Sequence, residues 1–183
     1  LRPARAEGFF VERRWAETHP EVKQPIPYVA VVRDADVLCL TRLSAQGERR
    51  LHGKRSIGVG GHVNPGDAAP DGAAGDLFTR ACVRELHEEL VLPGIGLPLR
   101  PIGLLNDETT PVGAVHVGLV FTLDARAFDV SIRETSAMSG GFEPLAALRR
   151  LADGADSPFE TWSALLLRSG ALASGAAVSP LQA

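Results

Sequence analysis

Short hydrophobic runs separated by polar turns predict several β-strands in this chain. Tyr28–Val32 and Val37–Arg42 flank the turn Asp34-Ala35-Asp36, so they indicate a β-hairpin. A third run, Ile57-Gly58-Val59, predicts a short strand that ends at Gly60-Gly61, where glycines permit close backbone approach to a ligand. Further strands are expected at Leu99–Leu105 and Val112–Leu123.

Helices are expected where apolar positions recur at helical spacing. One covers the acidic stretch that includes Arg84–Leu90, and Pro93-Gly94 is expected to end it. Two more are expected at Pro144–Ala152 and at Pro158–Leu167, the second of them capped by Ser157.

Three carboxylates fall on one strip of the predicted acidic helix. At helical spacing Glu85, Glu88 and Glu89 share an arc about 100° wide, beside the arc that faces the core. Carboxylates crowded within ~6 Å repel by roughly 2 to 3 kcal/mol per pair, and a bound cation turns that repulsion into attraction. A solvated helix face is the alternative interpretation, and the upstream Gly60-Gly61 pair favours the metal. The core-facing arc consists of Thr79, Cys82, Val83, Leu86 and Leu90, whereas Arg80, Arg84 and His87 point elsewhere.

Composition narrows the class of protein. The chain has 183 residues, of which 45% are hydrophobic and 22% are charged, as in a globular protein of one domain. Its net charge of -3 and its lack of basic blocks argue against a nucleic-acid partner and favour a small molecule. Cys39 and Cys82 lie in apolar runs and are expected to be reduced, as in a cytoplasmic protein. The apolar runs are too short or too interrupted to span a bilayer, so no membrane partner is expected.

The stretch from Gly60 to Leu92 resembles the signature of the Nudix (MutT-like) hydrolase family. That signature runs Gly, five residues, Glu, seven residues, and then Arg-Glu-apolar-any-Glu-Glu-any-Gly-apolar, and Arg84–Leu90 matches its second half. Val91 stands where the family has its late glycine, so we expect the helix exit to be built differently.

The loop before the acidic helix departs from the family spacing. Counting five residues on from Gly61 reaches Asp67, whereas counting back from Arg84 reaches Asp76, nine residues later, so the loop carries an insertion. Either aspartate can replace the first glutamate of the signature, which pairs with the arginine in this family. We favour Asp76 because it is next to the helix.

The resemblance implies an α/β fold class, a Nudix-type α/β/α sandwich with a mixed β-sheet flanked by helices. It also implies that Glu85, Glu88 and Glu89, helped by the backbone carbonyl of Gly60, bind Mg2+ or Mn2+ as the cofactor. Arg84, which fastens the loop, and Glu85 then belong to the catalytic machinery. A general base is expected from outside the helix, and the candidates are Glu134, which stands at the corresponding place, and alternatively Glu108 or Glu143.

Other residues near these motifs have ordinary structural interpretations. Lys54 and Arg55 precede the glycine turn and reach phosphates in one interpretation, but cations in a polar loop more often only contact solvent. His62 and His87 lack a Cys or His partner at metal-ligand spacing, so neither is expected to be a ligand. Phe159 and Trp162 are expected to pack the last helix onto the sheet.

We interpret residues 1–183 as a single Nudix hydrolase domain, with an N-terminal extension of about residues 1–24 and a mobile tail of about residues 169–183. Phe9–Thr18 fits a strand or a short helix, and the proline-rich segment after it predicts an extended chain. A homodimer stays open as the assembly state.

The expected activity is that of a Nudix pyrophosphohydrolase. It hydrolyses a phosphoanhydride (diphosphate) bond in a nucleoside diphosphate linked to another group, or in a related small molecule. One alternative is a catalytically silent Nudix ligand-binding or sensor module, which the intact acidic strip argues against. An isopentenyl diphosphate isomerase-like enzyme is the less favoured alternative, because neither cysteine lies in a suitable motif.

Overall fold

The fold is described from a computed structural model for residues 7–43, 53–68, 76–94, 96–133 and 135–172. In these ranges a sheet of seven strands runs in the order β3-β2-β1-β7-β6, with β4 paired to β1 and β9 paired to β2. A separate small sheet joins β5 to β8. The strands are β1 (Gln24–Arg33), β2 (Asp36–Arg42), β3 (Arg55–Ser56), β4 (Val59–Gly60), β5 (Leu90–Val91), β6 (Leu99–Leu105), β7 (His116–Asp124), β8 (Ser131–Ile132) and β9 (Met138–Pro144). The helices are α2 (Arg13–Ala16), α3 (Leu77–Glu89), α4 (Pro111–Ala114), α5 (Leu145–Asp153), α6 (Thr161–Ser169) and the 3-10 turn η2 (Pro65–Asp67).

Strand β1 lies at the centre of the large sheet. It pairs antiparallel with β2 in the predicted hairpin, antiparallel with β4, and parallel with β7. Two prolines, Pro25 and Pro27, fall in its first half. The Gln24 amide donates to the Val115 carbonyl at 2.8 Å. Backbone amides alternate in direction along a strand, so the backbone nitrogens of Pro25 and Pro27 face away from β7. The missing N–H groups of the two prolines therefore cost no hydrogen bond to β7.

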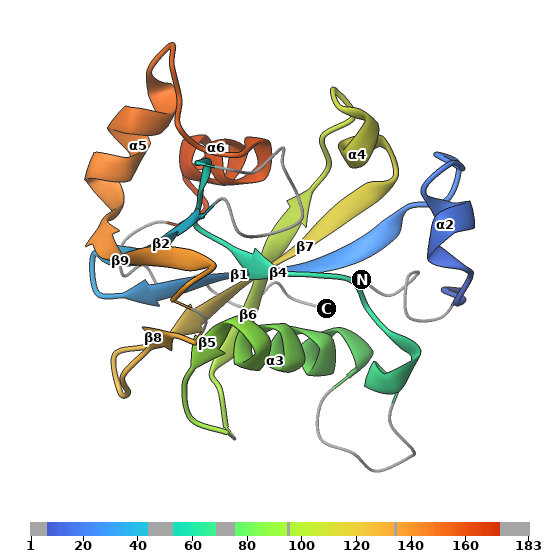
Figure 1. Cartoon of the computed structure of the whole chain (residues 1–183), viewed down its shortest axis with the longest axis horizontal. Coiled ribbons are helices and arrows are strands. Elements are labelled where there is room, and N and C mark those ends of the chain that lie inside the picture. The colour runs from blue at the N-terminus through green and yellow to red at the C-terminus, as the bar shows by residue number, and fades with distance from the viewer. Residues whose placement is uncertain (1–6, 44–52, 69–75, 95, 134, 173–183) are drawn as a thin grey trace, which may run out of the picture.

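Helices cover both faces of the sheet, as Figure 1 shows with α3 on one side and α5 and α6 on the other. The alternating residues of the strands supply two cores. The core under α3 contains Val29, Leu38, Leu40, Phe78, Leu86 and Phe121. The core under α5 and α6 contains Tyr28, Val37, Cys39, Val120, Leu148 and Phe159. This is the predicted α/β/α sandwich with a mixed sheet, and the prediction is confirmed.

Several predicted boundaries are wrong. The run expected as a strand from Val112 begins as helix α4, because Pro111 suits a first helical position and the Thr110 hydroxyl accepts from the Gly113 amide at 3.0 Å. The acidic helix ends at Glu89 rather than at Pro93-Gly94, because Leu90–Val91 leave it to pair with β8.

The last helix is capped by a different residue from the one expected. Glu160 caps α6, and its carboxylate accepts from the amides of Trp162 and Ser163 at 2.8 and 2.7 Å. The expected cap, Ser157, lies before the helix starts, and its buried hydroxyl has no hydrogen-bond partner among the described residues. Phe159 and Trp162 pack on the sheet-facing core as predicted.

A short helix is described near the N-terminus. Within Phe9–Thr18 the structure forms the short helix α2. The expected mobile tail falls mostly on residues 173–183, which lie outside the described residues. Across the described ranges, every helix is too short or too polar to be a candidate for crossing a membrane.

Candidate active site

The acidic strip is carried by α3, whose start is set by Asp76. The Asp76 carboxylate accepts hydrogen bonds from the amides of Phe78 and Thr79 at 2.9 and 3.1 Å, which makes it the N-cap of the helix. Our preference for Asp76 as the partner of Arg84 is therefore wrong. A side chain that caps the first turn is two turns away from Arg84 along the helix.

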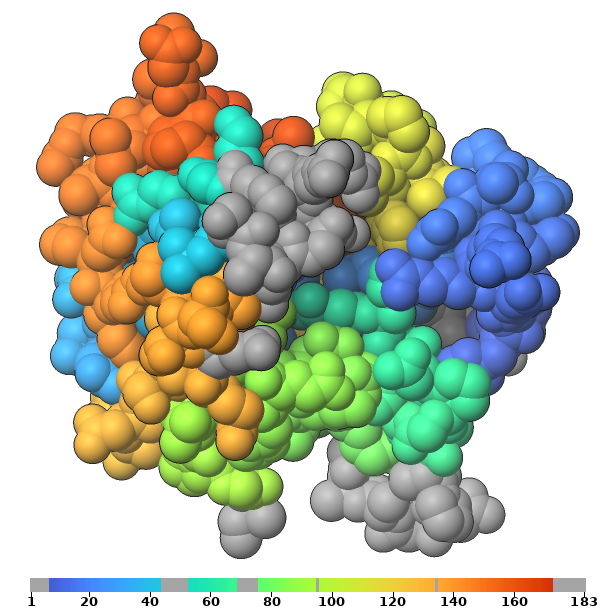
Figure 2. Space-filling model, in the orientation of Figure 1, coloured from blue at the N-terminus to red at the C-terminus, as the bar shows by residue number. Residues whose placement is uncertain are grey.

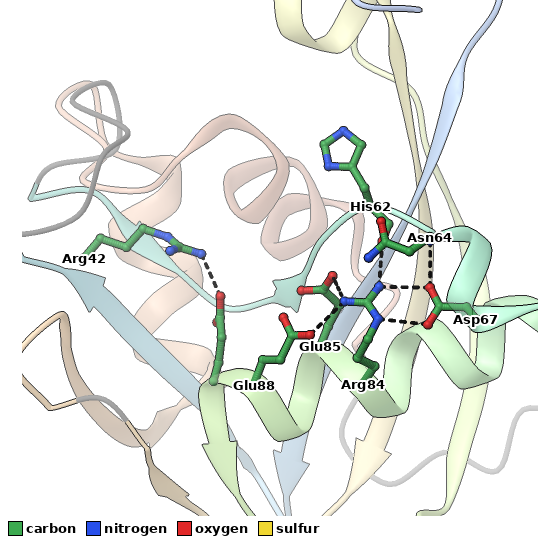
Figure 3. Close-up of polar contacts among 8 residues, drawn as sticks. Arg42, His62, Asn64, Asp67, Arg84, Glu85 and Glu88 are labelled. Atoms are coloured by element: carbon green, nitrogen blue, oxygen red, sulfur yellow. Dashed lines mark hydrogen bonds and ion pairs between the residues drawn. The ribbon is translucent and has the colours of Figure 1, made fainter. Parts of the chain in front are cut away.

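Asp67 is the carboxylate that pairs with Arg84. Arg84 Nε lies 2.8 Å from Asp67 Oδ1, and Arg84 Nη2 lies 3.0 Å from Asp67 Oδ2 (Figure 3). The side chain of Asp67 is only 5% exposed, and its Oδ2 also accepts from the Asn64 amide at 2.7 Å. Burial acts to raise the pKa of Asp67, but the hydrogen bonds from Arg84 and the Asn64 amide lower it below the ordinary value. The loop insertion thus follows Asp67, whose spacing from Gly61 is that of the family.

Arg84 also fastens the glycine turn to the helix. Its Nη2 donates to the backbone carbonyl of His62 at 2.7 Å, and its Nη1 lies 2.7 Å from Glu85 Oε1 and 3.0 Å from Glu88 Oε1. Arg84 lies outside the core-facing arc, as the helical spacing predicts, and its guanidinium points towards the acids. It lies among them, and these carboxylates, Asp67 first, raise its pKa.

Glu85 is the acid packed against the glycine turn. It is buried, and burial raises its pKa although Arg84 opposes the shift. A Cβ placed on Gly61 would lie 2.3 Å from Glu85 Oε1, so a larger residue there would displace this carboxylate from its position. At Gly60, a Cβ would lie 2.1 Å from the Pro27 carbonyl oxygen, because β4 crosses close to β1 there. Gly61 thus makes space for a side chain of the site, whereas Gly60 allows two strands to lie close together.

Glu88 and Glu89 differ strongly in environment. The Glu88 side chain is 56% exposed, whereas that of Glu89 is 17% exposed. Glu89 Oε1 pairs with Arg42 Nη2 at 3.1 Å, while its Oε2 is buried and has no hydrogen-bond partner among the described residues. Burial raises the pKa of Glu89, and Arg42 opposes the shift.

The donor set suits a hard divalent cation, although the side chains do not converge on one point. Within the described residues, no three His, Cys, Asp or Glu side chains are grouped closely enough to hold a metal ion. The carboxylates are divided between two cations, because Arg84 binds Glu85 and Glu88 whereas Arg42 binds Glu89. Carboxylate oxygens are the ligands that Mg2+ prefers. Glu89 Oε2 is buried and accepts no hydrogen bond from the described residues, so it is available to bind a cation.

The three candidates for a general base differ in their surroundings. Glu134 lies outside the described residues. Glu108 is exposed and pairs with Lys23 at 2.9 Å. Glu143, on β9, pairs with Arg55 at 2.5 Å. Arg55 therefore makes a part-buried ion pair within the protein, so the expectation that it only contacts solvent is wrong.

Two residues near the site were missed from the sequence, Arg42 and His116. Arg42 follows Leu38 and Leu40 at intervals of two in β2, and both leucines belong to the core under α3. That alternation is the signal that places Arg42 on the α3 face. His116 Nε2 lies 3.1 Å from His62 Nε2, and burial lowers the pKa of His62 to about 4. The His62 ring is thus neutral near pH 7, and no sequence pattern indicated its partner.

The surface around the segment of β4 and α3 is visible in the space-filling view. In Figure 2 the surface is hollowed between the N-terminal segment, drawn in blue, and the segment of β4 and its turn, drawn in teal. The turn after β4 carries His62, and α3 borders the same face.

Comparisons with known proteins identify the family. No family model matches the chain. The chain is 36% identical over 152 residues to protein YmaB of Bacillus subtilis (strain 168), and the match covers 81% of this chain and 71% of that protein. It is similar to the crystal structure of Tm1382, a putative Nudix hydrolase, at 31% identity and a TM-score of 0.66, covering 87% of this chain and 78% of the other. A Nudix hydrolase from Alicyclobacillus acidocaldarius shares the fold at 16% identity and a TM-score of 0.60, covering 79% of this chain and 89% of that one.

Fold, signature and relatives agree on one class of enzyme, the Nudix hydrolases. The chain belongs to the Nudix hydrolase family. It is therefore an enzyme of the pyrophosphohydrolase type, and hydrolysis of nucleoside diphosphate derivatives is the activity that its fold implies.

Proposed function

We propose that this protein uses Mg2+ or Mn2+ to hydrolyse the diphosphate bond of a nucleoside diphosphate linked to another group, or of a related small molecule. The observation that carries the proposal is the fastening of the acidic strip to the glycine turn. Arg84 joins Asp67, the His62 carbonyl, Glu85 and Glu88 in one network. A charged network of this kind holds the carboxylates of α3 in fixed positions next to the glycine turn.

Glu85, Glu88 and Glu89, with the carbonyl of Gly60, are the groups that would hold the cation. A divalent cation supplies charge neutralisation of phosphate oxygens and activation of a water molecule. The protein's own residues fix where this happens. Gly61 leaves room for the Glu85 carboxylate, and the Arg84–Asp67 pair fixes the turn against α3. Arg84 is thus a positioning residue, because its hydrogen bonds go to the protein.

Glu134 is our candidate for the general base. The two alternatives carry ion pairs of their own, Glu108 with Lys23 and Glu143 with Arg55. A general base must reach the water that it deprotonates, and a carboxylate that is bound to a cation within the protein is already engaged in another contact. This supports Glu134 over the other two.

The isomerase alternative requires a reactive cysteine, and the environment of both cysteines argues against it. Cys39 and Cys82 are buried and free of disulfides. Burial raises the pKa of Cys39 to about 11 and that of Cys82 to about 12, so neither thiol ionises near neutral pH. Reduced, buried thiols also support a cytoplasmic location as part of the proposal. The single domain and the homodimer stay predictions.

The proposal is tested by a panel of diphosphate-linked compounds assayed with Mg2+, with Mn2+ and with a chelator. We expect at least one nucleoside diphosphate derivative to be cleaved between its phosphorus atoms, and cleavage to stop with the chelator. Binding of such compounds without cleavage under any metal condition would favour the sensor module instead.

A further inference from the structure

Arg42 and Arg84 lie at opposite ends of the acidic strip (Figure 3). Arg84 comes from the helix itself, whereas Arg42 reaches the strip from the end of β2, 47 residues before Glu89. The Arg42 side chain is 25% exposed and that of Glu89 is 17% exposed. The pair is therefore shielded from solvent, so its charges interact more strongly than those of a surface ion pair.

The buried position of Glu89 makes its negative charge costly unless a cation lies beside it. Its carboxylate is largely buried, one oxygen is bound by Arg42, and the other has no hydrogen-bond partner among the described residues. An isolated buried carboxylate is costly, and Arg42 lowers that cost. A divalent cation held by the same carboxylate would offset it more fully, because it brings two charges.

A cation on Glu89 and the Arg42 guanidinium would repel each other if both kept their contact with the same oxygen. The guanidinium would then turn its hydrogen bond toward an acceptor close to the metal. The phosphate oxygens of a diphosphate, whose charge the cation would neutralise, would be such acceptors, and the planar guanidinium matches phosphate with two parallel N–H donors.

We propose that Arg42 is a substrate-binding residue, which holds Glu89 until the divalent cation binds and then donates to a phosphate oxygen of the metal-bound diphosphate. This inference rests on the proposed function, and it adds the residue that couples metal binding to phosphate binding. A purely structural pair makes the opposite prediction for metal affinity. If Arg42 only kept Glu89 in place, its loss would weaken metal binding.

The first test measures Mn2+ binding without substrate, by calorimetry, in the unaltered protein and in the variant Arg42→Gln. We expect Arg42→Gln to bind Mn2+ about three- to ten-fold more tightly, because the competing cation is gone. Arg42→Lys keeps the charge and should bind Mn2+ within about two-fold of the unaltered protein. Arg33→Gln is the control for loss of a part-buried arginine, since Arg33 donates to the carbonyls of Ala125 and Phe128, and it should leave Mn2+ affinity unchanged.

The second test measures binding of imidodiphosphate, a non-hydrolysable diphosphate, at saturating Mg2+. Both Arg42→Gln and Arg42→Lys should bind it about ten-fold or more weakly, because lysine lacks the two-donor fork. Circular dichroism of each variant checks folding, and the lysine variant keeps a counter-charge for Glu89.

The outcomes separate this inference from the proposed function. Weaker or unchanged Mn2+ binding in Arg42→Gln would overturn the role of Arg42, and so would normal imidodiphosphate binding in both variants. Either result leaves the proposed function standing as long as the unaltered protein binds Mn2+. Failure of the unaltered protein to bind Mn2+ at all would overturn the proposed function together with it.

Discussion

Arg84 holds Asp67 through two parallel hydrogen bonds, Nε to Oδ1 at 2.8 Å and Nη2 to Oδ2 at 3.0 Å. This pair joins η2, which follows the glycine turn, to the middle of α3. Because the Asp67 side chain is 5% exposed, solvent cannot replace the contact if one partner is lost. The position of the turn relative to the acidic strip therefore depends on this pair.

The substitution Asp67→Asn should destabilise the fold. It removes the charge that compensates Arg84, whose side chain is 26% exposed, and we expect a loss of about 2 kcal/mol in the free energy of unfolding. Asp76→Asn is the matched control, because asparagine caps a helix about as well as aspartate, and it should cost less than about 0.5 kcal/mol. Urea denaturation measures both. Equal losses in the two variants would contradict the assignment of Asp67.

Stability should fall in acid through the same residue. The pKa of Asp67 is lowered in the folded protein, so the folded state binds fewer protons than the unfolded chain around the ordinary pKa. The stabilisation that ionised Asp67 contributes to the free energy of unfolding is complete above the ordinary aspartate pKa. It is lost as the pH falls through the lower pKa that Asp67 has in the folded protein. The unfolding free energy, followed by urea titration from about pH 6 to about pH 3, should decline less steeply in Asp67→Asn. Parallel curves for the two proteins would argue against this source of acid sensitivity.

Gly61→Ala should impair turnover. A Cβ at this position would lie 2.3 Å from Glu85 Oε1, so the carboxylate or the turn must move. Displacement of a positioned group by about 1 Å commonly costs about 10²-fold in rate, and we expect a loss of that size. Gly66→Ala in the same loop is the control, because a Cβ there meets no atom within 4 Å. A normal rate in Gly61→Ala would remove Glu85 from the site.

Glu134→Gln should lower the rate by ~10²-fold or more if Glu134 is the general base, with little change in KM. The variant Glu143→Gln should instead lose stability, because Glu143 binds Arg55 at 2.5 Å. Steady-state kinetics measures the rates of both variants, and urea denaturation measures their stability, so the two roles are separated. A nearly normal rate in Glu134→Gln would move the base to Glu108 or Glu143.

The parts of the fold that follow from local patterns were predictable from the sequence. The hairpin around Asp34-Ala35-Asp36 and the strand Leu99–Leu105 agree with the structure, because alternation and turn residues are local signals. The start of α4 at Pro111 was missed because the apolar residues after it fit a strand equally well. Periodicity alone does not distinguish the two in so short a run.

The site was predictable only where its contacts are local. The strip of Glu85, Glu88 and Glu89 follows from helical spacing, but its partners come from other elements. Nearness in sequence favoured Asp76, whereas the chain folds Asp67 back onto Arg84 across 17 residues. Arg42 reaches Glu89 across 47 residues, and although the alternation in β2 indicates the face on which Arg42 lies, no local pattern indicates that the end of α3 packs next to it.

The metal site is tested most directly by the Mg2+ dependence of turnover in Glu88→Gln and Glu89→Gln, on the best substrate of the panel. Both changes keep the shape of the side chain and remove a ligand charge, so we expect a loss of about 10²-fold or more in each, with unchanged circular dichroism. Glu21→Gln, at an exposed glutamate outside the strip, controls for the loss of one charge and should keep its rate. Unchanged Mg2+-dependent turnover in both strip variants would contradict the assignment of the acidic strip as the metal site.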